Sequence, residues 1–220
     1  MPVEPLPTVS FFKRRNHAQN AVSPPHVFCA TLLGVETLTT PYLLLSAPEL
    51  LDPNFARTVV LMGHHSQEGA IGWIVNRVIE THAAGLLPPE LSEGIHPGTP
   101  LRLGGPVLTN GLIVVHTTET PGIESIEMSP GLRVSSSPEI LPRLFGSPSA
   151  KGRVAGLLVF GYSGWGPGQL EHEMEDGSWL VLPYDDAFAF SDDLQGLWER
   201  AMKRLGVKPE SVSMPPGGVN

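Results

Sequence analysis

The sequence predicts an α+β fold in which strands outnumber helices. Eight short apolar stretches are rich in Val, Ile and Leu and are bounded by Gly, Pro, Asn or Asp, a pattern typical of buried strands. They are YLLLSA, TVVLMG, AIGWIV, LRLGG, GLIVVHT, GLRVSS, RVAGLLVFG and SWLVLP. The HHSQEG segment between the second and third stretches is polar and short, so these two strands are expected to form an antiparallel hairpin.

The clearest predicted helix runs from Asp192 to Leu205. Ser191 is a suitable N-cap, and Gly206 is expected to end the helix. Its apolar residues recur at three- and four-residue steps and predict one buried face: Leu194, Leu197, Trp198, Ala201 and Leu205.

Shorter helices are predicted at three other places. Pro167 is expected to open a helix that continues through Asp176 and stops at Gly177. Two near copies, SAPELL at 46–51 and SSPEIL at 136–141, place a proline and a glutamate after a strand, and each predicts a helix start. Independent use of one start signal is the preferred explanation of the two copies, and duplication of a half-domain stays open.

One domain is expected at residues 41–207, because a chain of 220 residues can bury a sizeable core without disulfides. Residues 1–40 are predicted to be a loose leader containing Pro and Ser, and residues 208–220 a flexible tail rich in Pro, Gly and Ser. The leader carries a basic triplet and a later apolar run, but Pro24 and Pro25 separate them, so a signal peptide is not expected.

Composition excludes several classes of protein. The net charge of -8 opposes attraction to nucleic acid or anionic lipid, so nucleic-acid binding is not expected. Since no apolar run approaches about 18 residues, no membrane-spanning helix is expected. Cys29 is the one cysteine, which excludes an intramolecular disulfide framework and favours a cytoplasmic location.

The stretch GYSGWGPGQL, from Gly161 to Leu170, allows three interpretations. Ser163 after a buried strand invites comparison with a hydrolase nucleophile, but that motif needs glycine where Trp165 stands. A phosphate cradle would use glycine amides before a helix, but Pro167 removes one amide. The preferred interpretation is a structural corner in which the glycines let the aromatic side chains fold onto the sheet. One exposed aromatic side chain is expected to be left for a functional contact.

A second candidate segment runs from Asp52 to Thr58. It combines a turn-forming Asp-Pro-Asn with an aromatic residue and Arg57, which is expected to pair with a carboxylate. Asn76 and Arg77 end a following strand and are expected to reach the same end of the sheet. Together these residues predict a rim able to recognise an anion. The acidic EHEMED run and the His64–His65 pair lack metal-ligand spacing and are predicted to be solvated surface, so no metal site is expected.

Seven motifs in order give the chain a resemblance to a known family. They are LDPNFARTVVLM, EGAIGWIVNR, LGGPV, GLIVVHT, SSSPEIL, GYSGWGPGQLEHEMEDGSWL and WERAMKRLG. This pattern, over about three quarters of the chain, resembles the AlgH/YqgE family of bacterial proteins. The resemblance implies a bifurcated, largely antiparallel sheet that curls into a pseudo-barrel with flanking helices. It implies no reaction, although members are often labelled transcriptional regulators.

The sequence therefore predicts a noncatalytic regulatory or adaptor protein that binds a protein partner or a small effector. The candidate binding residues are Asp52, Asn54, Phe55, Arg57, Asn76, Arg77, Tyr162, Ser163, Gly164, Trp165, Gly166 and Gln169. The alternative is an enzyme or binder that acts on a small anionic ligand through Arg57, Arg77 and the Gly161–Gly168 loop. Direct DNA binding is less favoured, no cofactor is expected, and the oligomeric state stays open.

Overall fold

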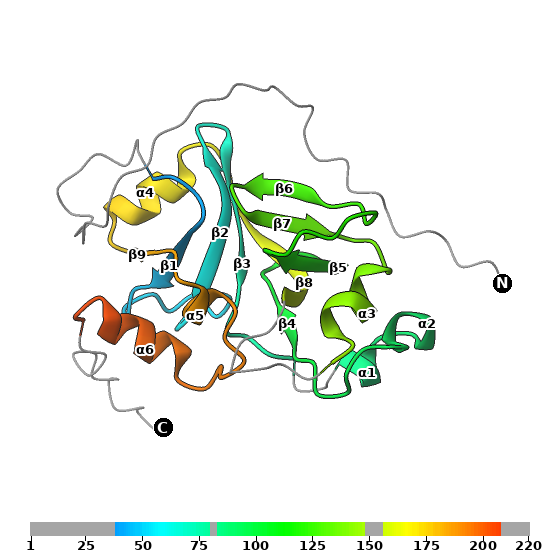
Figure 1. The fold of residues 1–220 in the computed structure, drawn as a ribbon. Helices are drawn as coiled ribbons and strands as arrows, with labels where there is room; N and C mark the ends of the chain where they lie inside the picture. The colour runs from blue at the N-terminus through cyan, green and yellow to red at the C-terminus, as the bar shows by residue number, and fades with distance from the viewer. Residues whose placement is uncertain (1–37, 80–82, 148–155, 208–220) are drawn as a thin grey trace. The chain divides into compact units, whose positions relative to one another are not determined.

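A computed structural model describes residues 38–79, 83–147 and 156–207, which form a curled sheet with helices at its margins (Figure 1). The predicted tail and residues 1–37 of the predicted leader lie outside the described residues. The nine strands are β1 Tyr42–Ser46, β2 Val59–Ser66, β3 Gly69–Ile74, β4 Leu101–Leu103, β5 Val107–His116, β6 Ile126–Ser129, β7 Leu132–Ser135, β8 Gly156–Trp165 and β9 Trp179–Pro183. The α+β prediction is confirmed.

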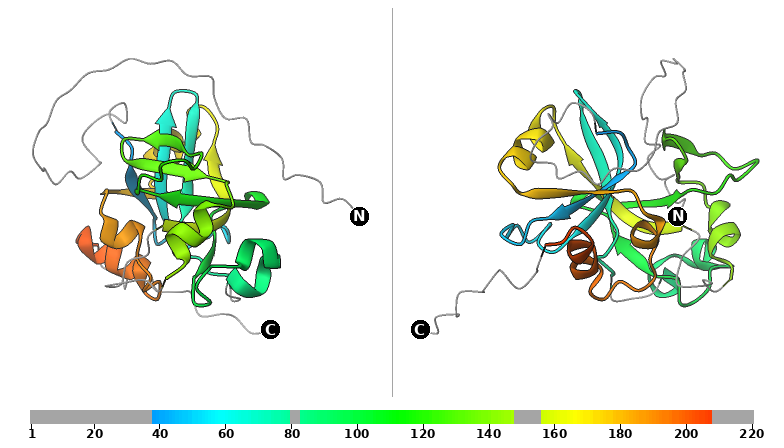
Figure 2. Two further views of the ribbon diagram at one scale, coloured as in Figure 1. Left: turned by 45° about the vertical axis from the view of Figure 1, so that its right-hand side comes forward. Right: turned by 60° about the vertical axis from the view of Figure 1, so that its left-hand side comes forward.

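The strands are ordered β6-β7-β5-β8-β3-β2-β1-β9, and all neighbours in this order are antiparallel. The hairpin of β2 and β3 is as predicted, with Ser66 opposite Gly69. Strand β4 is off this path and runs parallel to β8. In the left view of Figure 2, β6 and β7 (green) cross in front of β2 and β3 (cyan), and Met128 of β6 lies against Gly63 of β2, so the sheet curls over itself.

Strand β8 makes the sheet bifurcate. Its first half pairs with β4 and β5, and its last residues, Ser163 to Trp165, pair with β3. Gly161 lies between the two halves with φ +71°, and a Cβ there would meet the Val107 carbonyl oxygen at 2.7 Å. Gly105 is equally constrained, because its Cβ would lie 2.3 Å from the Tyr162 backbone. Glycine is therefore required at both positions, because the backbone of the LGGPV segment touches β8 at the point where β8 changes neighbours. We call this point the fork.

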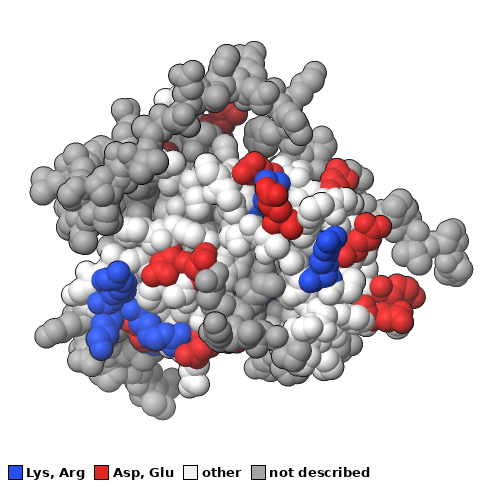
Figure 3. All heavy atoms as spheres, viewed as in Figure 1, with Lys and Arg blue, Asp and Glu red and all other residues white. Residues whose placement is uncertain are grey.

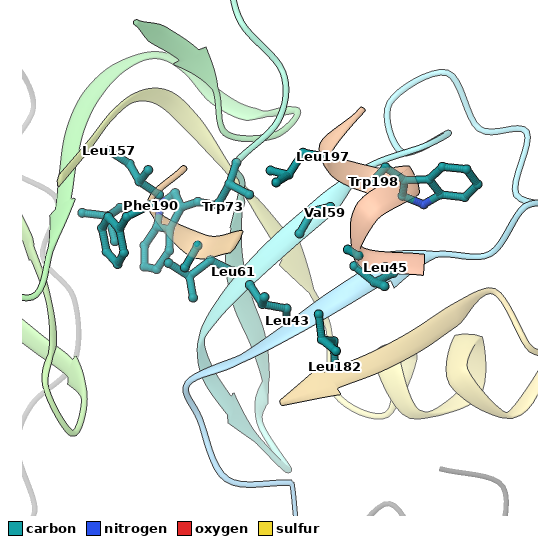
Figure 4. Packing of buried hydrophobic residues seen from close by; sticks show 14 of the residues in the cluster. Leu43, Leu45, Val59, Leu61, Trp73, Leu157, Leu182, Phe190, Leu197 and Trp198 are labelled. Atoms are coloured by element: carbon teal, nitrogen blue, oxygen red, sulfur yellow. The ribbon is translucent and has the colours of Figure 1, made fainter. Parts of the chain in front are cut away.

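Both faces of the sheet are buried along β1 and the first half of β2, which explains the apolar runs YLLL and VVLM. Figure 4 shows the cluster on one face, where Leu197 and Trp198 pack near Leu45 and Val59. The opposite face holds Leu44, Val60 and Met62 beneath α4, and a third cluster lies between β8, α1 and α3. The helices are α1 Ala83–Leu86, α2 Pro89–Ser92, α3 Ile140–Phe145, α4 Gln169–Glu175, α5 Asp186–Ala189 and α6 Leu197–Arg204.

Three predicted helix starts are wrong. Helix α6 begins at Leu197 instead of Asp192, because Gly196 has left-handed dihedrals and Ser191 donates to the Asp193 carbonyl instead of capping the helix. Helix α4 begins after Gly168 for the same reason, although Gly177 follows its end as predicted.

The first copy of the repeated SxPE signal also fails, since residues 47–50 form only a turn. Pro53 follows closely and disfavours helical dihedrals in the residue before it. The second copy does precede a helix, α3.

Candidate functional site

The turn from Leu51 to Arg57 carries the first group of predicted site residues. Asp52 organises it: its carboxylate accepts from the Asn54 amide at 2.7 Å, and its carbonyl accepts from the amides of Phe55 and Ala56 at 2.9 and 2.7 Å. Asp52 and Asn54 are exposed, and Leu51, immediately before Asp52, is 83% exposed. An exposed apolar side chain therefore flanks a hydrogen-bonded turn.

Asn76 fixes the base of this turn to the sheet. Its side-chain oxygen accepts from the Val59 amide at 2.8 Å, and its side-chain nitrogen donates to the Arg57 carbonyl at 2.9 Å. Arg77 donates to the Ala56 carbonyl at 3.3 Å. Asn76 and Arg77 therefore do meet the 52–57 segment, as expected from their position at the end of β3.

Both guanidinium groups of the predicted anion-recognising rim are engaged within the protein. Arg57 pairs with Glu199 of α6 at 2.9 Å and lies over the Trp198 ring, 5.2 Å from its centroid. Burial lowers the pKa of Arg77, and the negative charge of Asp52 opposes that shift. An anion at this rim would have to compete with the Glu199 carboxylate for Arg57.

Three aromatic rings meet below the turn. Phe55 stacks on Trp165 with centroids 6.0 Å apart and contacts Trp179 edge-on at 5.4 Å, while the two indoles are 5.8 Å apart. The indole N–H groups of Trp165 and Trp179 both donate to one oxygen of Glu173, at 2.9 and 2.7 Å. The expectation of an exposed aromatic in this loop is wrong for Trp165, which is 6% exposed because Phe55 and Trp179 cover it.

The glycine-rich loop is closed by its own hydrogen bonds. Ser163 is fully buried and donates to the Gly104 carbonyl at 3.1 Å, a position from which it cannot serve as a surface nucleophile. Gly164 and Gly166 are exposed, but the Gly166 amide donates to the Gln169 side chain at 3.0 Å. Gln169 donates in turn to Glu173 at 2.9 Å. The loop is a structural corner, the interpretation preferred from the sequence.

Tyr162 is separated from the other candidates. It is half-buried against the cluster that contains Trp73 and Trp198, whereas Trp165 belongs to the cluster on the opposite face. The predicted site therefore divides into the Leu51–Arg57 turn with Asn76 and Arg77, the Phe55–Trp165–Gln169 group beneath it, and Tyr162 elsewhere.

A hydrogen-bonded relay beside α4 was missed from the sequence. The Tyr42 hydroxyl lies 2.8 Å from Nδ1 of His65, and Nε2 of His65 lies 2.8 Å from the Glu171 carboxylate. Burial, with a smaller contribution from Glu171, raises the pKa of Tyr42, so the phenol stays protonated and donates to His65. The prediction that the EHEMED run is only solvated surface is wrong for Glu171 and Glu173, because both bind buried side chains.

A buried arginine was also missed. Arg102 is 1% exposed and donates to the carbonyls of Val75 and Ser191, both at 2.9 Å. Burial lowers its pKa to about 10, while Asp192 opposes the shift, so the guanidinium remains charged at neutral pH. No spacing in the LRLGG stretch signals this role.

The described residues contain neither a metal-ion cluster nor a membrane-spanning helix. Within residues 38–79, 83–147 and 156–207, no group of three or more His, Cys, Asp or Glu side chains is placed to hold a metal ion. None of the helices in these ranges combines the length and apolar character needed to cross a bilayer.

The chain is similar to known proteins over most of its length. The sequence model of the AlgH-like family matches residues 43–210. A UPF0301 protein of Ruegeria pomeroyi is 34% identical, covering 81% of this chain and 97% of its own, and one of Vibrio cholerae is 30% identical with the same coverage.

Two solved structures share the fold. The solution structure of AlgH from Pseudomonas aeruginosa has a TM-score of 0.59 and 29% identity, covering 81% of this chain and 95% of that one. A crystal structure of a Corynebacterium diphtheriae protein, 22% identical with a TM-score of 0.60 over 80% of this chain and 91% of that one, shows likeness of fold alone. From the family match and the relatives at 30% identity or more, the chain belongs to the AlgH-like family of bacterial proteins.

Proposed function

We propose that this protein is a regulatory or adaptor protein that binds a polypeptide partner through Leu51, at the start of the Leu51–Arg57 turn. The observation that carries the proposal is the 83% exposure of Leu51 directly before residues 52–57, whose backbone is held by side-chain hydrogen bonds at both ends. A large apolar side chain at such a position contributes little to the fold. A cytoplasmic setting is part of the proposal and fits the single cysteine of the chain.

The frame of the turn supports a role in recognition. Asp52 and Asn76 hold the backbone of residues 52–57 at its two ends, so this part of the surface has little conformational entropy to lose when a partner binds. Leu51 lies beside an exposed carboxylate and an exposed amide, Asp52 and Asn54. This surface fits a shallow apolar pocket rimmed by hydrogen-bond donors on the partner.

The competing proposal of an enzyme or binder for a small anion has weaker support. Its cations are Arg57 and Arg77, and each already has a partner in the protein, Glu199 and the Ala56 carbonyl. The Gly161–Gly168 loop would have to break the contact of Gly166 with Gln169 to offer that amide to a phosphate. Binding of an anion would therefore cost several existing interactions.

The test compares tagged full-length wild type with Leu51→Asp, both purified gently from the protein's own host. Leu86→Asp is the matched control, because Leu86 is also an exposed leucine, at 45%. We expect one polypeptide to copurify in a near-fixed ratio with wild type and with Leu86→Asp, and to be lost from Leu51→Asp. Against that isolated partner, Leu51→Asp is expected to weaken the Kd at least about tenfold.

Two results would overturn the proposal. One is copurification of the same polypeptides with all three proteins. The other is a small-molecule adduct in the native mass spectrum of wild type that Arg57→Ala removes, which would support the anionic-ligand alternative. Equal thermal midpoints of the three proteins would show that the substitutions leave the fold intact.

A further inference from the structure

A serine and a histidine outside the Leu51–Arg57 turn form a pair with catalytic geometry. His116 ends β5, and Ser125 immediately precedes β6, so the connection between these strands brings them together. Ser125 Oγ lies 3.3 Å from Nε2 of His116, and Nδ1 of His116 lies 2.8 Å from the Thr118 carbonyl oxygen. This is the order of nucleophile, base and orienting group found in activated serines.

The hydrogen bonds fix the tautomer of the imidazole. A carbonyl oxygen only accepts, so Nδ1 of His116 must carry a hydrogen to donate to Thr118. In the neutral ring this leaves Nε2 as a bare acceptor, and the Ser125 hydroxyl is then the donor of the second contact. The Thr120 hydroxyl, 3.5 Å from Ser125 Oγ, is positioned to orient that oxygen.

The surroundings keep His116 in the neutral form that a base needs. Its side chain is fully buried, and this burial lowers its pKa; Arg133 lowers it further, while the bond to Thr118 acts in the opposite direction. Arg133 lies opposite His116 in the pairing of β5 with β7, and its carboxylate neighbours are Glu119 at 3.7 Å and Glu127 at 3.8 Å. Both of these N···O distances exceed the usual length of a hydrogen bond, so neither carboxylate hydrogen-bonds to Arg133.

We propose that Ser125 is a nucleophile activated by His116 and that it accepts the acyl group of small carboxylic esters. Ser125 is half-buried, so its hydroxyl combines access with proximity to a buried base. The neighbouring Ile126 is 43% exposed and offers an apolar surface for a short acyl chain. The proposal adds a reaction to the binding role above and uses none of the residues of the Leu51–Arg57 turn.

The reaction balances with these groups and water. As Ser125 Oγ bonds to the ester carbonyl carbon, its proton moves to Nε2 of His116; the bond from carbon to the ester oxygen then breaks, and the alcohol leaves with that proton. Water gives a proton to His116, attacks the acyl carbon, and releases Ser125 with its proton restored.

The test uses a fluorophosphonate probe on the full-length protein, followed by peptide mass spectrometry. Oγ attacks phosphorus, fluoride leaves, and a stable phosphonyl ester marks the serine. We expect labelling at Ser125 but not at Ser137, which is also half-buried. We also expect hydrolysis of p-nitrophenyl acetate that Ser125→Ala abolishes and Ser137→Ala leaves unchanged.

A second variant tests whether His116 acts as a base or only as a structural hydrogen-bond partner. His116→Asn keeps an amide N–H for the Thr118 carbonyl and removes the acceptor at Nε2, so labelling of Ser125 should slow by at least about 100-fold. If His116→Asn does not fold, Ser125→Cys replaces it: the introduced thiol should react with iodoacetamide at pH 7 at least about tenfold faster than that of Ser137→Cys.

The proposal is overturned by wild-type protein that remains unlabelled at Ser125 under conditions that fully label a known serine hydrolase. It is equally overturned if folded His116→Asn labels at the wild-type rate, because the histidine would then only hold the connection between β5 and β6. In the thiol experiment, equal alkylation rates for the two cysteine variants would have the same meaning.

Discussion

At the scale of single residues, Glu173 shows how one carboxylate can organise a buried aromatic group. One of its oxygens accepts from both Trp165 and Trp179, and the other accepts from Gln169 at 2.9 Å. Hydrogen bonds to an ionised acceptor are stronger than those between neutral groups. The carboxylate therefore ties α4 to β8 and β9 and fixes the two rings on which Phe55 rests.

Glu173→Ala should lower the free energy of unfolding by about 2 to 4 kcal/mol, because it leaves two largely buried indole N–H groups without their acceptor. Glu175→Ala, on the same helix and exposed, should change it by less than about 0.5 kcal/mol. Urea denaturation followed by tryptophan fluorescence measures both. Equal losses in the two variants would contradict this assignment of Glu173.

Some residue contacts were accessible from sequence and others were not. Asn76 and Arg77 could be placed beside the 52–57 turn because a hairpin returns the end of β3 to the start of β2. Arg102 could not be predicted, since its acceptors lie 27 and 89 positions away and depend on how loops cross the sheet. The pair of His116 and Ser125 was missed because the stretch between them contains no periodic pattern.

At the scale of elements, β8 is the strand on which the architecture depends. Gly161 changes its direction at the fork, and the LGGPV segment packs backbone to backbone against that point. The sequence could identify β8 from its apolar run, but the same run says nothing about which neighbours each half would have. The neighbours of each half depend on the close contact between Gly161 of β8 and the glycines of the LGGPV segment, which are distant from it in sequence.

Gly161→Ala should destabilise the protein by at least about 2 kcal/mol more than Gly168→Ala. Both glycines have nearly the same left-handed φ, +71° and +72°, so the cost of that conformation for alanine is shared. Only at Gly161 does a Cβ meet other atoms, 2.7 Å from the Val107 carbonyl oxygen, whereas nothing lies within 4 Å at Gly168. Thermal and urea unfolding of the two variants measure the difference, and similar values would argue against a tight fork.

Strand β6 and the start of α6 show the limits of periodicity. In β6, Ile126 and Glu127 are both exposed, so this edge strand carries no continuous apolar run to reveal it. The segment before α6 has the composition of a helix start, but Gly196 adopts left-handed dihedrals and delays the helix. Strands buried on both faces, such as β1, were predictable because every residue is apolar or small.

At the scale of the whole molecule, the charge is acidic but unevenly distributed. Figure 3 shows Lys and Arg side chains gathered over the region of α6, which contributes Arg200, Lys203 and Arg204. Carboxylates accompany this patch, since Arg200 pairs with Asp193 at 3.3 Å and Arg57 with Glu199 at 2.9 Å. The local positive potential is therefore reduced by its own neighbours.

From this balance, a labelled DNA duplex of about 25 base pairs should show no saturable binding at about 50 mM salt, with any Kd weaker than about 10⁻⁴ M. Fluorescence anisotropy measures this directly. A salt-dependent rise in anisotropy that disappears in the double variant Lys203→Glu, Arg204→Glu would instead identify α6 as a nucleic-acid surface.

The shared strand also determines how the molecule can be divided. Strands β1–β3 and β9 complete one arm of the sheet, β4–β7 complete the other, and both arms need β8. Segments from the two ends of the described chain therefore build the first arm, and its middle builds the second. A cut on either side of β8 would leave one arm without the strand that it shares with the other, so the arms are not autonomous modules. They are expected to be gained, lost and inherited only together.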